Sequence, residues 1–216
     1  GPGASVARHM FRLMDPISQR MMGLRADMTT QVARIAATRL RQAPRPLRLC
    51  YAGQVLRVRG SQLRPERQYA QAGVELIGAD GVAGDAEVVL LAAEALQALG
   101  VQGLSVDLTA PSLVPLLTQS LGLEGSEAEA ARQALDARDG AAIETLVPHV
   151  RQQLGDLMRA AGPADSALEC LAGLALPAPA RALCDHLADL VAWLNKHNGG
   201  LTLTIDPGES RGFEYQ

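Results

Sequence analysis

RLCYAGQVLRVR (48–59) and RQYAQAGVELIG (67–78) are predicted to form two strands of one antiparallel hairpin. Successive side chains of a strand point to opposite faces, so alternate residues share a face. Polar or small residues of the second run share one face: Gln71, Gly73 and Glu75. Apolar residues share the other: Ala72, Val74 and Leu76. The hairpin is therefore predicted to have one polar and one apolar face.

The polar face offers hydrogen-bonding groups of both signs. Arg57 and Arg59 alternate along the first run and supply donors, Gln71 is a further donor, and Glu75 is an acceptor. A zwitterion such as an amino acid needs both signs held a few bonds apart, and Gly73 leaves room above the backbone. The alternative is an ordinary hairpin whose charged face is solvated surface, which the spacing alone leaves open.

The composition is that of a globular chain. It has 216 residues, of which 48% are hydrophobic, enough for one good core or two small ones. No window approaches the ~20 consecutive apolar residues of a membrane helix, and no basic, apolar leader opens the chain. The sequence therefore predicts a cytoplasmic protein without a membrane partner.

The charge pattern bears on nucleic-acid binding. A net charge of −3 argues against a broad nucleic-acid surface, and 3% aromatic residues are too few for a base-stacking platform. Arginines nevertheless cluster between positions 39 and 67, where Glu66 is the single acidic residue. They are Arg39, Arg41, Arg45, Arg48, Arg57, Arg59, Arg64 and Arg67. Such a patch is compatible with a phosphorylated metabolite, RNA or an acidic protein partner, or with a solvated loop. We expect no nucleic-acid partner.

The cysteines and histidines show no metal-site or nucleophile pattern. Cys50, Cys170 and Cys184 are odd in number, widely spaced and without a CxxC pair. They predict reduced, mostly buried thiols rather than a disulfide framework or a zinc site. The histidines are scattered as well: His9, His149, His186 and His197. No metal, cofactor or Cys/His nucleophile is predicted.

Two elements are predicted before the main hairpin. Residues 9–15 and 19–27 form a short hairpin. Residues 29–40 have apolar side chains at helical spacing, and Asp27 or Thr29 is expected to cap this helix.

A helix and a strand are predicted after the main hairpin, over residues 78–100 and 104–108, and Asp85 is expected to cap the helix. The order hairpin, helix, hairpin, helix, strand predicts an α+β fold with an antiparallel sheet.

The character of the chain changes between 111 and 198 to segments rich in alanine and leucine. Helices are predicted at 111–122, 126–136, 139–160, 164–173 and 178–197. A strand at 200–206 then resumes the sheet. We therefore expect a core made of residues 1–110 and 199–216, truncated at both ends, and a helical insertion over 111–198, with Trp193 as a core or interface residue.

The polar hairpin residues, together with GLRADMT (23–29) and SRGFEY (210–215), resemble the catalytic core of class II histidyl-tRNA synthetases. They are still more similar to a non-aminoacylating relative, the regulatory subunit of ATP phosphoribosyltransferase in histidine biosynthesis. The resemblance covers most of 9–109 and 199–216, and the helical insert matches in position and character only. It implies a class II synthetase-like antiparallel sheet flanked by helices, with a helical insertion.

The resemblance also implies which residues hold histidine: Asp27, Thr29, Arg57, Gln71, Glu75, Arg211 and Tyr215. In the synthetases, the acid and threonine of the first motif hold the α-amino group, and the strand pair supplies an arginine, a glutamine and a glutamate. A later arginine-glycine motif reaches the carboxylate and the imidazole. We expect Asp27, Thr29 and Glu75 near the ammonium of the ligand. Gln71 and Arg211 are expected nearer its carboxylate or ring, with Arg57 as a second anion contact.

Two departures from the synthetase pattern argue against an enzyme. Arg59 stands where the synthetases have a glutamate that recognises adenine, and an arginine cannot accept a hydrogen bond from the adenine amino group. The synthetase motif acid-glycine-threonine is replaced by Asp27-Met28-Thr29. The sequence RADMT is typical of the regulatory subunits.

The resemblance thus implies a non-catalytic subunit that binds histidine as effector and a short-form ATP phosphoribosyltransferase catalytic subunit. A homodimer within a larger hetero-oligomer is expected on the same ground. The alternative is a histidyl-tRNA synthetase catalytic-core fragment that activates histidine with ATP. A third possibility is an α+β domain whose charged hairpin is solvated surface and binds no amino acid.

Overall fold

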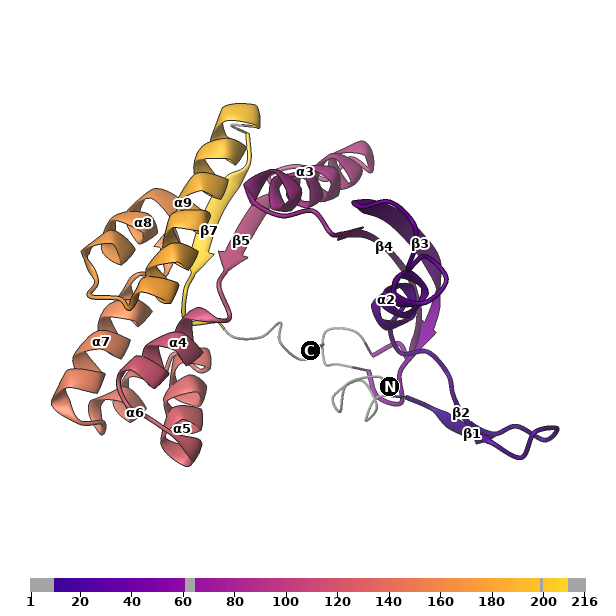
Figure 1. Cartoon of the computed structure of the whole chain (residues 1–216), viewed down its shortest axis with the longest axis horizontal. Helices are drawn as coiled ribbons and strands as arrows, with labels where there is room; N and C mark the ends of the chain where they lie inside the picture. Colours follow the sequence, from indigo (N-terminus) through magenta and orange to yellow (C-terminus); the bar gives the residue numbers. More distant parts are fainter. Residues whose placement is uncertain (1–9, 61–64, 199, 210–216) are drawn as a thin grey trace. The chain divides into compact units, whose positions relative to one another are not determined.

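The computed structural model describes residues 10–60, 65–198 and 200–209. The chain divides into two compact units at the junction between Asp80 and Gly81. We call the part up to Asp80 the N-terminal unit and the part from Gly81 the helical unit; Figure 1 labels their elements. The sequence predicts a different boundary, between residues 110 and 111, where a helical insertion begins. Division into compact units does not test whether a segment is an insertion, so this boundary stays a prediction.

The N-terminal unit begins with a small antiparallel hairpin, β1 (Arg12–Met14) and β2 (Met21–Gly23). The Asp15 carboxylate in its turn accepts hydrogen bonds from the Ser18 hydroxyl and from the backbone N–H groups of Ile17 and Ser18. The bond from the Ser18 hydroxyl, followed by these backbone bonds, lowers the pKa of Asp15. Aspartate favours turns because its short side chain reaches the backbone just ahead. The predicted hairpin is confirmed.

The main sheet of the N-terminal unit is the antiparallel pair β3 (Leu47–Leu56) and β4 (Gln68–Ile77). Helix α2 (Thr29–Ala37) contacts both strands. Its buried residues Val32 and Ala36 lie one turn apart, as an amphipathic helix on a sheet requires. The predicted helix and strands are confirmed.

The polar face of this sheet is the covered face. The register pairs Gln71 with Gly53 and Glu75 with Leu49, and all four are partly buried. The opposite face carries small side chains that are exposed: Cys50, Ala52, Ala70 and Ala72. The interpretation of Gln71 and Glu75 as solvated surface is therefore wrong.

The arginines at the end of the first strand are not part of the sheet. Strand β3 ends at Leu56, three residues before the predicted end of this run. The backbone N–H of Arg57 still donates to the carbonyl of Arg67 at 2.7 Å. Arg59 lies farther along and is exposed. The Arg57 guanidinium nevertheless lies over the ring of Tyr69, which is two residues from Gln71 along β4 and so shares its face. For Arg59, which is exposed, the shared face stays a prediction.

The helical unit holds the remaining elements. In chain order they are α3 (Val82–Ala98), β5 (Ser105–Thr109), α4 (Leu113–Ser120), α5 (Gly125–Asp136), α6 (Gly140–Glu144), α7 (Pro148–Arg159), β6 (Gly162–Pro163), α8 (Ala164–Gly173), α9 (Ala178–His197) and β7 (Thr202–Asp206). The predicted helices are confirmed, except that the one expected over 139–160 is two helices. Pro148 starts the second, where its missing N–H and fixed φ are tolerated.

The sheet of the helical unit has the strand order β5-β7-β6. Strand β7 pairs with β5 in parallel and with β6 antiparallel. The parallel pair differs from the antiparallel sheet that we expected. Parallel strands need a long crossover connection, and the helices between β5 and β7 provide it.

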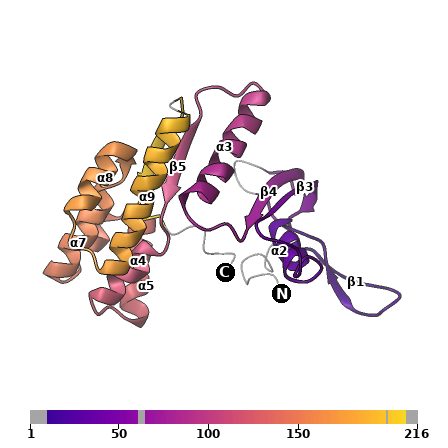
Figure 2. The ribbon, with the colours of Figure 1, turned by 45° about the horizontal axis from the view of Figure 1, so that its top comes forward.

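Helix α3 begins at Val82 with Gly81 as its N-cap, so the predicted capping role of Asp85 is wrong. Asp85 lies in the first turn, and its carboxylate Oδ2 is 2.6 Å from Nε2 of His186 on α9. This side-chain contact joins α3 to α9, two helices that pack against each other (Figure 2).

The core of the helical unit consists mainly of leucines, alanines and valines from its helices, together with apolar residues of its strands such as Ile205 of β7. Its largest fully buried side chains are Leu113, Val114, Leu117, Val150, Leu154, Leu157, Leu171, Leu194 and Ile205. Trp193 packs against this core, and its ring stacks on His197 with the centroids 3.8 Å apart. Trp193 is thus partly buried at the edge of the core, which fits either of its two predicted roles, core or interface residue.

The cysteines are free thiols. Cys184 is buried, and burial raises the pKa of its thiol. Cys50 and Cys170 are exposed, so the expectation of mostly buried thiols is wrong for these two.

Over the described ranges, no three His, Cys, Asp or Glu side chains gather as a metal site. Among the helices of these same ranges, none is long and apolar enough to cross a membrane.

Candidate functional site

The segment that precedes α2 is tied to the sheet of the N-terminal unit. The backbone N–H of Leu56 donates to the carbonyl of Arg25 at 2.9 Å, and Nε of Arg25 donates to the carbonyl of Gln54 at 2.7 Å. These bonds place the next residues, Asp27 and Thr29, beside the polar face of β3 and β4. Residues far apart in the sequence thereby meet at one site.

Asp27 is the buried acid of this site, with 7% of its surface exposed. Its Oδ1 accepts a hydrogen bond from the backbone N–H of Thr29 at 2.7 Å, and Nε2 of Gln71 lies 3.3 Å from Oδ2. The N-cap position of α2 belongs to Met28, so neither Asp27 nor Thr29 occupies the predicted position. Asp27 nevertheless satisfies one of the free N–H groups at the start of the helix.

Gln71 joins the acid to the backbone. Its Oε1 accepts a hydrogen bond from the N–H of Met28 at 2.9 Å, while its Nε2 faces Asp27. Both ends of the amide are thus used, which fixes its orientation. The structure brings together Asp27, Thr29 and Gln71 as the sequence predicts.

Glu75 lies on the same face as Gln71, four residues farther along β4. It is partly buried, and none of the hydrogen bonds or ion pairs between described residues involves its carboxylate. A partly buried carboxylate without a partner is costly unless a ligand or water satisfies it. Glu75 is therefore the acceptor of this face that is available to a cation.

Arg57 is held by the protein. Its Nε donates to the carbonyl of Ala26 at 3.3 Å, and its guanidinium lies over the ring of Tyr69, 5.4 Å from the centroid. This bond joins Arg57 to the residue next to Asp27, so the end of β3 supports the site. Arg57 lies near the site even though it is outside the strand.

Tyr51 belongs to the site, although the sequence favoured no functional role for it. Its hydroxyl lies 2.9 Å from Oγ1 of Thr29, and the register places its residue opposite Gly73. The space above Gly73, which the sequence assigned to a ligand, holds this ring. The sequence offers only the alternation along the strand as a signal, because the register that pairs Tyr51 with Gly73 comes from the structure.

Two predicted site residues, Arg211 and Tyr215, lie outside the described residues. Their place in the site stays a prediction.

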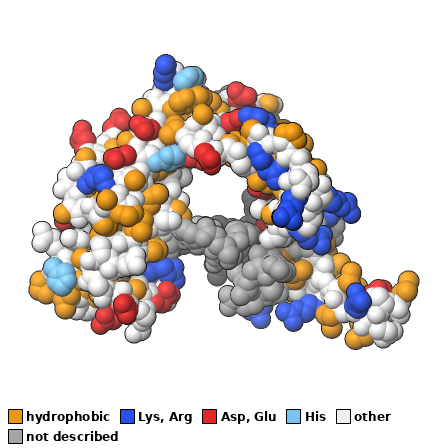
Figure 3. Space-filling model, in the orientation of Figure 1, with side chains coloured by type: hydrophobic (Ala, Val, Ile, Leu, Met, Phe, Trp, Pro, Cys, Tyr) orange, Lys and Arg blue, Asp and Glu red, His pale blue; other side chains and the backbone are white. Residues whose placement is uncertain are grey.

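Arginines gather over the N-terminal unit, as the blue side chains in Figure 3 show. Those of the predicted cluster that are exposed are Arg39, Arg41, Arg45, Arg48, Arg59 and Arg67. Arg64 lies outside the described residues. The cluster is a charged surface rather than part of the polar sheet face.

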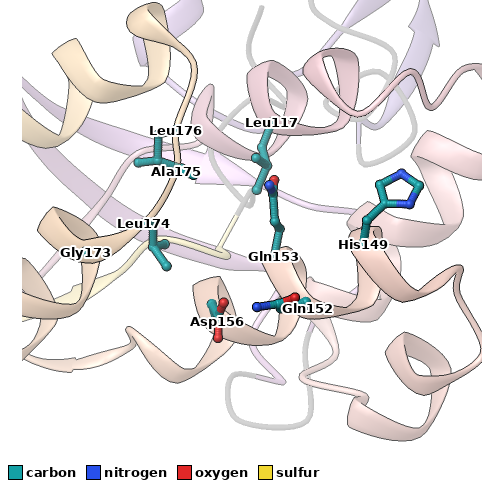
Figure 4. Close-up of a pocket in the computed structure, with 9 residues that line it drawn as sticks. All are labelled: Leu117, His149, Gln152, Gln153, Asp156, Gly173, Leu174, Ala175 and Leu176. Atoms are coloured by element: carbon teal, nitrogen blue, oxygen red, sulfur yellow. The ribbon is translucent and has the colours of Figure 1, made fainter.

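The helical unit contains a separate pocket of about 270 Å³. One wall is a polar stripe on α7, formed by His149, Gln152, Gln153 and Asp156, and Leu117 of α4 faces it (Figure 4). Residues 173–176 complete the lining. No residue in this lining was predicted as a site residue.

The whole chain, residues 1–216, matches the family model described as histidyl-tRNA synthetase. The chain belongs to the histidyl-tRNA synthetase family.

Within the family, the chain is similar to the ATP phosphoribosyltransferase regulatory subunit of Rhodospirillum centenum, with 55% identity over 216 residues. The match covers 100% of this chain and 56% of that protein. The chain thus spans about half the length of the curated relatives that it matches.

Solved structures show the same fold. The first is an ATP phosphoribosyltransferase regulatory subunit/histidyl-tRNA synthetase from Bacillus halodurans, with a TM-score of 0.81 and 26% identity, covering 93% of this chain and 53% of that one. The second is the ATP phosphoribosyl transferase (HisG:HisZ) complex from Thermotoga maritima, with a TM-score of 0.70 and 19% identity, covering 94% and 71%. The expected class II synthetase-like fold is confirmed.

Proposed function

We propose that this chain is part of a non-catalytic regulatory subunit of ATP phosphoribosyltransferase, which binds histidine and the catalytic subunit in the first step of histidine biosynthesis. The carrying observation is that hydrogen bonds join Asp27, Thr29 and Gln71 at the covered face of the sheet, the face on which Glu75 also lies. The Rhodospirillum centenum relative, an ATP phosphoribosyltransferase regulatory subunit that is 55% identical over the whole chain, supports the same role.

The chemistry of the site suits an α-amino acid. Glu75 offers a carboxylate without a protein partner among the described residues, and Gln71 on the same sheet face contacts a second carboxylate, that of Asp27. An ammonium group is stabilised by such acceptors, and charge-assisted hydrogen bonds are stronger than neutral ones. We propose that Asp27, Thr29 and Glu75 hold the ligand's ammonium. We propose that Gln71 and Arg211 bind its carboxylate or imidazole and that Arg57 is a second contact for an anionic group. Tyr215 is the last of the proposed histidine-binding residues.

The absence of adenylate chemistry is part of the proposal, and Arg59 supports it. Arg59 is exposed just beyond β3, at the position where the synthetases have an adenine-recognising glutamate. A guanidinium has only donors, so it cannot accept the hydrogen bond that the adenine amino group offers.

Feedback inhibition requires that histidine distinguish between arrangements of the complex. An effector shifts an equilibrium only by the difference in its affinity for the two states. The Thermotoga maritima structure is a HisG:HisZ complex, which supports assembly with a catalytic subunit. We further propose a cytoplasmic homodimer within a hetero-oligomer, with residues 111–198 as an insertion in the synthetase-like core.

The test is calorimetric titration of histidine and ATP, separately, into the complete protein that carries this chain. The proposal predicts binding of histidine and no binding of ATP. Failure of histidine to bind a folded protein overturns the proposal and favours a polar face without an amino-acid ligand.

The second candidate is a histidyl-tRNA synthetase that activates histidine, and it is favoured by the description of the family itself. It predicts binding of both ligands and histidine-dependent exchange of pyrophosphate into ATP. Exchange above the background measured without histidine would decide for the synthetase.

A further inference from the structure

Tyr51 is bound to the site through its hydroxyl. The phenolic oxygen lies 2.9 Å from Oγ1 of Thr29, and both residues are partly buried. Tyr51 extends from β3, whereas Thr29 is the first residue of α2. The bond therefore links the sheet to the start of the helix that covers it.

Gly73 makes this position of the tyrosine possible. A Cβ at residue 73 would lie 2.4 Å from both Cζ and the hydroxyl oxygen of Tyr51, closer than real Cβ atoms approach other atoms. A glycine in the interior of a strand weakens the strand, and it often marks a close approach of another group. Here the group is the Tyr51 ring.

The hydrogen bond to Tyr51 selects one of the orientations open to the Thr29 hydroxyl. A threonine in a helix divides between two χ1 rotamers, so its hydroxyl is not fixed by the backbone. The backbone N–H of Thr29 is already bonded to Asp27 at 2.7 Å. The tyrosine adds the bond that orients the side chain, and Asp27 continues the contacts to Gln71.

We infer that Tyr51 is a positioning residue of the amino-acid site, which acts through the hydroxyl of Thr29, and that Gly73 is required to admit its ring. This inference rests on the proposed function, because it concerns the binding of an α-amino acid at that site. Tyr51 itself needs no contact with the ligand.

The test is a double-mutant cycle on histidine affinity in the complete protein, with the variants Tyr51→Phe, Thr29→Val and the pair. Tyr51→Phe removes one hydrogen bond, the bond that orients the Thr29 hydroxyl toward the ligand. This loss is expected to weaken histidine affinity about fivefold. In the Thr29→Val background the same change is expected to alter affinity less than about twofold, since the group through which it acts is gone. Phenylalanine keeps the ring, so the sheet packing is retained.

Two further variants sharpen the result. Gly73→Ala is expected to displace the ring and to weaken affinity at least as much as Tyr51→Phe. Thr38→Val makes the same substitution as Thr29→Val at the other end of α2, where the hydroxyl donates to the carbonyl of Arg34. Its histidine affinity is expected to match that of the wild type.

The outcomes separate the inference from the proposed function. If the wild type binds histidine and Tyr51→Phe binds equally well, the inference is overturned and the proposed function stands. Equal losses in both backgrounds also overturn it, because the tyrosine would then act without Thr29. If the folded wild type does not bind histidine, the proposed function itself has failed.

Discussion

The side-chain amide of Gln71 lies against the carboxylate of Asp27, with Nε2 of the glutamine 3.3 Å from Oδ2 of the acid. The same amide accepts a hydrogen bond from the backbone N–H of Met28 at 2.9 Å. One side chain from a strand thus holds both an acid and the backbone at the start of a helix. This arrangement makes the position of the acid depend on the sheet.

Replacing Gln71 with alanine is expected to destabilise the protein as well as the site. The change removes one donor from Asp27, which is 7% exposed, and the acceptor of the Met28 N–H. A buried polar group left unsatisfied costs about 1–3 kcal/mol. We expect a loss of this size in the free energy of unfolding measured with urea.

Gln54→Ala is the matched control for Gln71→Ala. Gln54 lies in β3 of the same sheet, and its side chain is on the exposed face. Its loss is expected to change the free energy of unfolding by less than about 0.5 kcal/mol. Equal effects of the two substitutions would contradict the structural role of the Gln71 amide.

Replacing Glu75 with alanine or glutamine is expected to weaken histidine binding at least about tenfold while the protein stays folded. A hydrogen bond between the Glu75 carboxylate and the ligand's ammonium is expected to contribute about 1.5–3 kcal/mol to the binding free energy. The free protein loses little, since the described residues offer the Glu75 carboxylate no hydrogen bond or ion pair. Calorimetry measures the affinity, and circular dichroism reports the fold.

The control for Glu75 is Glu66→Gln, which neutralises an exposed carboxylate of the same unit. It is expected to leave histidine affinity unchanged. Wild-type affinity in a folded Glu75 variant would remove Glu75 from the site.

The helices and strands of this chain follow from local sequence patterns. The apolar spacing of Val32 and Ala36 predicts α2, and the alternation around Gln71 and Glu75 predicts β4 and the residues that share its face. The resemblance identifies Asp27 and Thr29 as partners of this face. Such features depend on neighbouring residues or on short motifs, so one sequence is enough to find them.

The remaining features depend on contacts between distant residues. Alternation shows that Gln71 and Glu75 share a face, but only the docking of α2 decides that this face is covered. The parallel pairing of β5 with β7 depends on the path of the helices between them. The role of Tyr51 requires the register that places it opposite Gly73, and the sequence alone does not fix that register.

The stability of the helical unit is expected to depend on Leu194, which is fully buried in α9. Leu194→Ala removes apolar surface and leaves a cavity, which costs about 2–5 kcal/mol. Leu91→Ala makes the same change on α3, where the side chain is 44% exposed, and should cost much less. Urea unfolding of the two variants measures the difference, and similar losses would contradict the assigned core.

Glu129 on α5 is expected to make the stability of the helical unit depend on pH at acid values. Hydrogen bonds from Arg132 and then Gln133 lower the pKa of its carboxyl from 4.5 to about 2. Because the folded pKa is the lower one, the stabilisation is complete above about pH 4.5 and is lost as the pH falls toward about 2.

Glu129→Gln should therefore be less stable than the wild type at pH 7, and the difference should shrink steadily from about pH 4.5 down to about pH 2. Thermal unfolding at a series of pH values measures this difference. Glu94→Gln on α3, an exposed carboxylate of the same unit, corrects for the loss of one charge. A difference between Glu129→Gln and the wild type that stays constant across this pH range would show that the carboxylate does not stabilise α5 through these bonds.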